Sequence, residues 1–396
     1  MFNLAIACWK RARGCGMPRR LERGGAVKDG VADTKNDQAG LPLAATLQRH
    51  RFVFLDALRG LAAVMVVFYH RRELLPNGLA EHGYLAVDFF FMLSGFVIAY
   101  AYEDKLRTGM SRTSFIVRRL QRLMPLVILG ACLGLFVEVL KALTKHSTDR
   151  LIDAVIAFPF AALSLPNLPN SSSEIFLLNP PTWSLFFELI ANVLYALFIK
   201  RLSNTVVISV ALASGAALFV ISTNFDSVEV GQNFDNVQYG IFQVLFPFST
   251  GILLFRYRLQ STNTVSGFVA AVLAVVLFAV LFTPVLPAGS NYLYDFALVA
   301  MLFPLTIYIG ARVAISSGWF ALFIEAAGML SYAVYITHVP LLDALDYPLA
   351  WLSALSPIKM VVYVGVVIIA AYGATAFYDA RIQAYFKRKN TPRRAW

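Results

Sequence analysis

The chain has 396 residues, of which 58% are hydrophobic and 14% are charged, and its mean hydropathy is +0.65. A soluble protein of this length cannot hide so much apolar surface in one core. The composition therefore excludes an ordinary soluble enzyme and indicates a membrane protein. The formal net charge of +11 is not read as a nucleic-acid surface, because no soluble basic domain is present to hold a nucleic acid.

The first segment, residues 1–47, is polar, basic and rich in glycine, and it shows no apolar periodicity. Its apolar fragment NLAIACW is too short for the core of a signal peptide. We expect a largely disordered cytoplasmic tail, or a start placed too far upstream. The three cysteines, Cys8, Cys15 and Cys132, are odd in number and scattered, so the sequence predicts neither a disulfide framework nor a metal site.

Ten apolar stretches follow, each near the length of about 20 residues that an α-helix needs to cross a bilayer. Because these runs are continuous rather than alternating, they predict an all-α, polytopic membrane protein. Most of the 34 Lys and Arg residues fall on one side if both termini are cytoplasmic, which sets the predicted orientation. The predicted spans are about 52–70, 84–102, 123–141, 182–199, 205–222, 239–256, 264–283, 293–310, 321–340 and 357–377.

These spans form a predicted membrane domain over 48–380, followed by a basic cytoplasmic tail over 381–396. The loop 142–181 contains LIDAVIAFPFAALSL at 151–165, which is apolar but interrupted by Pro159. This piece is predicted to be interfacial, re-entrant or spanning, and the three alternatives stay open. Arg71 and Arg72 fall on the predicted outer side, against the charge pattern.

The first span carries three ionisable residues on one face. Asp56 and Arg59 are i, i+3 neighbours and are predicted to form an ion pair. His70 follows Arg59 by eleven residues, which places it about 20° around the helix and roughly 16 Å along the axis. One helix face would thus join an ion pair at the cytoplasmic end to an imidazole near the outer end. The alternative is that all three side chains simply reach the two interfaces.

Other spans carry ionisable residues at a similar predicted depth. By topology, Asp88, Glu188 and His338 all fall in the outer leaflet together with His70. Ionisable groups inside a bilayer are costly, so each is a candidate functional residue. We therefore expect these four side chains to share one polar cavity.

Further polar positions share these helix faces. Ser184 lies one turn before Glu188, Tyr335 lies one turn before His338, and Gly95 leaves room for a neighbouring helix. The stretch RTSFIVRRLQR at 112–122 includes Arg118, Arg119 and Arg122, whose forked guanidinium groups suit phosphate. An ordinary cytoplasmic cluster on anionic lipid is the alternative.

At these residues the chain resembles the acyltransferase-3 family of polytopic membrane enzymes. The matching pieces are LDALRGLAAVMVVFYH, VDFFFMLSGF, RRLQR followed by Pro125, TWSLFFE and SYAVYITH. They occur in the family's order and cover about residues 51–340. Bacterial members acylate lipopolysaccharide O-antigens, exopolysaccharides, peptidoglycan and Nod factors. The resemblance thus implies an O-acetyltransferase in the inner (plasma) membrane.

The resemblance also implies that acetyl-CoA is the donor and that a glycan or lipid-linked saccharide is the acceptor. It makes His70 and Arg59 an essential pair. Arg119 and Arg122, with neighbouring Arg118, would engage the donor. Glu188 and the signature residues Ser94 and Gly95 are expected at the site, and Trp183, Ser184 and Tyr335 are expected on the acceptor side. Many members have a Glu-Pro pair near the end of the last span, whereas this chain has Asp379 without the proline.

For the chemistry, His70 could act as a general base, oriented by Asp88 or Glu188, or it could carry the acyl group itself. A proton-coupled transporter or flippase is the rival prediction, because embedded carboxylates and histidines can relay protons. A sensor or scaffold that has lost catalysis is a third.

Overall fold

The chain divides into two units, Met1–Arg51 and Phe52–Trp396, and the described residues all belong to the second. A computed structural model describes residues 52–167, 175–258, 265–287, 289–313, 319–346, 348–351 and 356–390. The predicted disordered tail over 1–47 lies outside this part. The α-helices are α2 (Val53–Tyr69), α3 (Ala86–Thr108), α4 (Arg112–Thr144), α5 (Thr148–Ala162), α6 (Thr182–Phe198), α7 (Asn204–Phe225), α8 (Gly240–Arg258), α9 (Gly267–Leu281), α10 (Asn291–Ala297), α11 (Phe303–Gly310), α12 (Trp319–Asp346), α13 (Ser356–Gly373) and α14 (Ala380–Asn390).

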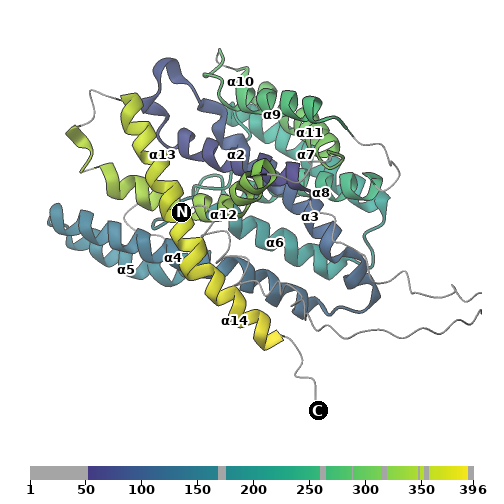
Figure 1. Cartoon of the computed structure of the whole chain (residues 1–396), viewed down its shortest axis with the longest axis horizontal. Coiled ribbons are helices and arrows are strands. Elements are labelled where there is room, and N and C mark those ends of the chain that lie inside the picture. Colours follow the sequence, from purple (N-terminus) through teal and green to yellow (C-terminus); the bar gives the residue numbers. More distant parts are fainter. Residues whose placement is uncertain are drawn as a thin grey trace, which may run out of the picture. The chain divides into compact units, whose positions relative to one another are not determined.

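The protein is all-α (Figure 1). Several helices begin at a serine whose hydroxyl accepts a hydrogen bond from the backbone N–H three residues later, which satisfies one of the free donors of the first turn. These N-cap residues are Ser111 for α4, Ser147 for α5, Ser203 for α7 and Ser266 for α9. The starts of these helices are therefore encoded locally.

Each predicted span contains a helix. Among the described residues, seven helical stretches are long and apolar enough to cross a membrane. The other three predicted spans correspond to shorter helices, because α2 and α6 have 17 residues each and α9 has 15. The structure thus agrees with a polytopic membrane protein, while its set of full-length candidates is smaller than the ten predicted spans.

Large apolar side chains on the outside of the bundle point to the same conclusion. A water-soluble surface rarely gathers so many of them, whereas a lipid-facing surface requires them. Among those more than 60% exposed are Leu212, Phe268, Val275, Met301, Val361 and Ile369.

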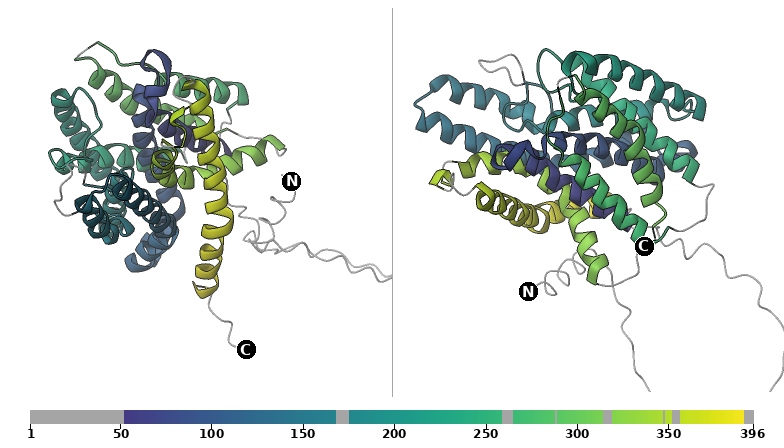
Figure 2. Two further views of the ribbon diagram at one scale, coloured as in Figure 1. Left: turned by 90° about the vertical axis from the view of Figure 1, so that its left-hand side faces the viewer. Right: turned by 90° about the horizontal axis from the view of Figure 1, so that it is seen from above.

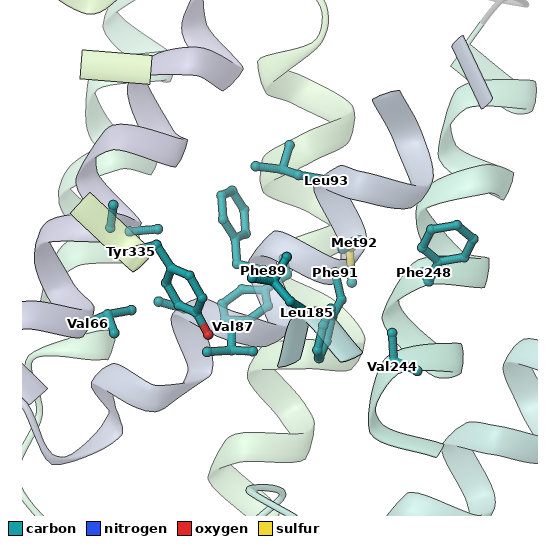
Figure 3. Packing of buried hydrophobic residues seen from close by; sticks show 14 of the residues in the cluster. Val66, Val87, Phe89, Phe91, Met92, Leu93, Leu185, Val244, Phe248 and Tyr335 are labelled. Atoms are coloured by element: carbon teal, nitrogen blue, oxygen red, sulfur yellow. The ribbon is translucent and has the colours of Figure 1, made fainter. Parts of the chain in front are cut away.

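The core of the bundle forms where α2 crosses α12 and α3 crosses α8, and these are the most extensive helix pairings. The α2–α12 crossing is close because Gly328 has no side chain. A Cβ atom at this position would lie 2.6 Å from the Cβ of Asp56. Figure 3 shows part of the buried cluster, to which α2, α3, α6, α8 and α12 contribute Val66, Val87, Leu185, Val244 and Tyr335.

Two pairs of consecutive helices, α4–α5 and α13–α14, differ in how they are connected. Helices α4 and α5 lie side by side as a hairpin, with the turn between them at the end of α4 (Figures 1 and 2). Helix α5 covers Thr148–Ala162 and has 15 residues, so residues 151–162 of the 151–165 piece are helical and the last three are not. Helix α13 continues through a π-helical segment, Ala374–Asp379, into α14, so the predicted C-terminal tail begins as helix.

Candidate active site

His70 and His338 meet where the C-terminal end of α2 faces α12. His338 Nε2 lies 3.3 Å from His70 Nδ1, and the two ring centroids are 4.7 Å apart at an interplanar angle of 76°. His338 is fully buried, whereas His70 is half-buried. The sequence predicted both residues at this depth, and the structure places their rings in contact.

The hydrogen bonds define one consistent pair of tautomers. A carbonyl oxygen only accepts, so His70 Nδ1, 2.9 Å from the Val66 carbonyl oxygen, carries a proton. By the same reasoning His338 Nδ1, 2.7 Å from the Tyr335 carbonyl oxygen, carries one too. The single His70 Nδ1–H is then shared between the Val66 carbonyl oxygen and the lone pair of His338 Nε2. In neutral His70 this leaves Nε2 unprotonated, which is the form a general base needs.

Arg71 is hydrogen bonded to the backbone of His70. Its Nη1 donates to the His70 carbonyl oxygen at 2.7 Å, and its Nη2 donates to Asp343 at 2.7 Å and to Asp346 at 2.8 Å. Arg72 donates to Glu81 at 2.6 Å. Both arginines that departed from the charge pattern are thus held by carboxylates at the end of the bundle that carries His70, called the His70 end below.

Ser184 and Tyr335, both expected on the acceptor side, contact each other. Their hydroxyl oxygens are 2.6 Å apart, and each lies 3.0 Å from the Pro181 carbonyl oxygen. Since each hydroxyl has one proton, one hydroxyl donates to the other and the second donates to the carbonyl. Tyr335 lies one turn before His338, so this contact fixes the turn whose carbonyl orients the His338 ring. Trp183 is buried with its ring centroid 6.3 Å from that of Phe91, so it packs in the core, and its role on the acceptor side stays a prediction.

Arg59 forms its predicted ion pair. Its Nη2 lies 2.9 Å from Asp56 Oδ1 and also donates to the Gly328 carbonyl oxygen at 2.6 Å. Its Nε donates to the Ser331 hydroxyl at 3.0 Å. Arg59 thus fastens α2 to α12 at the end of α2 opposite His70, and it is more deeply engaged in the protein than an arginine reaching for an interface.

Glu188 belongs to a different group from His70. Its Oε1 accepts from Arg119 Nη2 at 2.8 Å and from the Ser94 hydroxyl at 2.6 Å. The side chains of Glu188 and Arg119 are 17% and 16% exposed. Arg119 is therefore paired with a carboxylate inside the bundle, and its predicted contact with the donor stays a prediction. The signature residue Ser94 has a defined partner.

Arg122 pairs with Asp379, the residue that stands where the family's Glu-Pro pair is expected. The Arg122 Nη1 to Asp379 Oδ2 distance is 2.9 Å, and the Arg122 side chain is 46% exposed. Its guanidinium lies 6.0 Å from the ring centroid of Tyr332, which follows Ser331 in α12. Arg118 is exposed. Arg118 and Arg122 are thus the predicted donor-site arginines that remain accessible.

Asp88 and Gly95 have structural partners. Asp88 is fully buried and accepts from Gln243 Nε2 at 3.2 Å. Gly95 allows α8 to approach, because a Cβ atom there would lie 2.0 Å from the Phe248 carbonyl oxygen. Neither Asp88 nor Glu188 is hydrogen bonded to His70 among the described residues. Of the four ionisable groups expected in one cavity, His70 and His338 are the pair in direct contact among the described residues, and the shared cavity stays a prediction.

Depth along each helix was predictable, whereas the partner across the helix interface was not. The sequence reasoning therefore missed Asp343 and Lys141, whose Nζ lies 2.8 Å from Asp343 Oδ2. The signal that could have found them was the pair of arginines on the unexpected side, because cations at that depth need nearby carboxylates. Among the described residues no group of three or more His, Cys, Asp or Glu side chains is arranged to hold a metal ion.

The chain is similar to several known proteins. The profile of the acyltransferase domain family (Acyl_transf_3) matches residues 52–377. The chain is 36% identical over 186 residues to "Protein 2 in picA locus" of Rhizobium radiobacter, covering 44% of this chain and 96% of that protein. It is 27% identical to "Putative O-acetyltransferase SACOL0978" of Staphylococcus aureus (strain COL), covering 72% of this chain and 49% of that protein.

"Putative membrane-bound transacylase BcsY" of Komagataeibacter xylinus is 25% identical, over 74% of this chain and 73% of that protein. The chain thus spans about half the length of the staphylococcal relative and about three quarters of the transacylase. No solved structure matches. The family match covers most of the chain and includes His70, His338, Arg59, Arg119 and Arg122, so the protein belongs to the membrane-bound acyltransferase-3 family.

Proposed function

We propose that the protein is a multi-pass O-acyltransferase of the plasma membrane, with ten spans and both termini cytoplasmic. It moves an acyl group, acetyl from acetyl-CoA, to a hydroxyl of a cell-surface or exported glycan. The observation that carries this proposal is the His70–His338 pair, in which the tautomers leave His70 Nε2 as a base. Family membership supports the reaction class.

In the proposed step, His70 Nε2 takes the proton of the acceptor hydroxyl as its oxygen attacks the thioester carbonyl. The carbon–sulfur bond then breaks, and the protonated His70 returns its proton to the departing thiolate. The products are an O-ester and free CoA thiol. His338 Nε2 stabilises the transient imidazolium by accepting from His70 Nδ1, the role that a carboxylate plays in a catalytic triad.

The donor is proposed to enter from the cytoplasmic end. Arg122 and Arg118 are accessible there for its phosphates, since Arg119 is committed to Glu188. Arg59 lies on the same face of α2 as His70, roughly 16 Å below it. The pantetheine arm would follow this face to the histidines.

The test is the variant His70→Ala in membranes and in cells. We expect normal amounts of folded protein and loss of acyl groups from extracted glycans, measured by mass spectrometry. His146→Asn is the matched control, because His146 is exposed in the turn after α4 with a φ of 50° that asparagine tolerates. Normal glycan acylation in His70→Ala would reject the proposal. Purified protein that never cleaves acetyl-CoA would favour a transporter or flippase.

A further inference from the structure

A polar cavity of about 700 Å³ opens at the His70 end, between α4, α5 and α12. This volume falls within the range of small-molecule sites. Its apolar wall includes Val137, Val339 and Pro340, and four carboxylates and three cations among the described residues line the remainder. The acyl-transfer step and the donor route proposed above use none of these side chains.

The cavity adjoins the histidine pair through two residues. Val339, which lines it, directly follows His338 in α12. Asp343, also in the lining, accepts from Arg71 at 2.7 Å, and Arg71 holds the His70 carbonyl oxygen. A molecule seated in the cavity would therefore lie beside the residues that place His70.

Most charge in the lining is already paired. Lys141 Nζ lies 2.8 Å from Asp343 Oδ2 and 3.0 Å from Glu138 Oε1, and Arg150 Nε lies 2.6 Å from Glu138 Oε2. With Arg71, these residues form a continuous ion chain from α2 across α12 and α4 to α5. Arg71 also pairs with Asp346 at 2.8 Å, so three carboxylates face these three cations. An acidic ligand would therefore find no uncompensated positive charge there.

Carboxylates outnumber cations in this lining, and Asp149 and Lys145 are both exposed. Carboxylate oxygens accept hydrogen bonds from hydroxyl groups, often two from adjacent positions. The apolar wall suits the C–H faces of a sugar ring. This arrangement suits a hydroxyl-rich molecule and repels carboxylate or phosphate groups.

We propose that this cavity is the acceptor site and that it selects a saccharide unit carrying no acidic group. The proposal rests on the proposed function, because it identifies the acceptor of the same acyl transfer. Asp149 would hold the sugar hydroxyls, and the ion chain would keep the cavity wall and His70 in fixed relation.

The experiment changes single charges in the full-length protein, produced in its host cell from which the native gene has been deleted. The variants are Asp149→Lys, Asp149→Asn and Lys145→Glu. The matched control is Asp235→Lys, because Asp235 is an exposed carboxylate in a loop and does not line the cavity. Acyl groups on extracted glycans are measured by mass spectrometry, which also identifies the acylated unit. Acetyl-CoA hydrolysis in isolated membranes reports donor chemistry separately.

Asp149→Lys and Asp149→Asn are expected to lower glycan acylation about tenfold, the effect of losing roughly one hydrogen bond to a charged group, with unchanged acetyl-CoA hydrolysis. Lys145→Glu and the Asp235 control should stay within about twofold of wild type. The acylated unit should carry no carboxylate or phosphate.

Three results would overturn the inference. These are unchanged acylation in both Asp149 variants, increased acylation in Asp149→Lys with loss in Lys145→Glu, or an acidic acylated unit. Each can occur while His70→Ala still abolishes acylation, so the cavity assignment can fail while the proposed function stands. Failure of the proposed function itself would appear as normal acylation in His70→Ala.

Discussion

His338 Nε2 lies 3.3 Å from His70 Nδ1, so a neutral histidine stands where many acyl-transfer enzymes place a carboxylate. The arrangement fits its surroundings. Both rings sit among apolar helices, and a buried carboxylate would require a second compensating charge. A neutral partner orients His70 through its lone pair without that cost.

Replacing this partner gives the first prediction. His338→Phe keeps an aromatic ring but removes the acceptor nitrogen. We expect kcat for acyl transfer to fall about a hundredfold, because the imidazolium on His70 loses its stabilising contact. The KM for the donor should stay near the wild-type value, since donor contacts are at the other end of α2. An unchanged kcat in well-folded protein would contradict the role given to His338.

The second prediction concerns the half-buried Arg119–Glu188 pair. Arg119→Met leaves Glu188 without its counter-charge, and we expect the free energy of unfolding to fall by about 3 kcal/mol. The double variant Arg119→Met/Glu188→Gln should recover much of this loss, because no lone charge remains. Unfolding in mixed micelles measures both.

Arg118→Met is the matched control for this pair, since Arg118 is exposed and one residue away. Its unfolding free energy should change by less than about 0.5 kcal/mol. Equal losses in Arg118→Met and Arg119→Met would argue against a specific ion pair.

Helix approach at Gly95 gives the third prediction. Because an added Cβ would lie 2.0 Å from the Phe248 carbonyl oxygen, Gly95→Ala must push α3 and α8 apart. We expect a loss of about 1–3 kcal/mol in unfolding free energy and lower activity, since the adjacent Ser94 bonds Glu188. Gly365→Ala is the control, because nothing lies within 4 Å of its added Cβ. A Gly95→Ala protein as stable as this control would refute the packing argument.

The fourth prediction is a pH dependence that originates in the loop after α7. Burial raises the pKa of Glu229 to about 7 from the ordinary value of 4.5, although a hydrogen bond from Tyr69 opposes the shift. Between pH 4.5 and 7 the folded state then binds more protons at Glu229 than the unfolded state does. The contribution of Glu229 to stability is therefore present at low pH and is lost as pH rises through this window.

Glu229→Gln should remove this slope, which thermal unfolding in detergent between those pH values would measure. Activity offers a second readout of the Glu229 titration, because Tyr69 lies between Glu229 and His70. The Tyr69 hydroxyl donates to Glu229 at 2.9 Å, and the Tyr69 ring centroid lies 5.3 Å from that of His70. A slope that persists in Glu229→Gln would assign the dependence to another group.

The sequence by itself determined the features that depend on one helix at a time. Each of the ten spans that hydropathy predicted contains a helix, and the i, i+3 spacing predicted the Asp56–Arg59 ion pair. Serine N-caps marked the starts of several helices. These features follow from the fixed rise and rotation of an α-helix, which backbone hydrogen bonds set independently of the neighbours.

Only the tertiary structure decided which side chains meet across helices. His70 and Glu188 were predicted at similar depth, yet one contacts His338 and the other Arg119. The rotation of each helix about its axis, and hence the partner of each polar group, results from the packing of all apolar side chains together. The spacing of residues along one helix does not specify how that helix is rotated against its neighbours. The separation of the histidine pair from the arginine pairs therefore appears only in the folded protein.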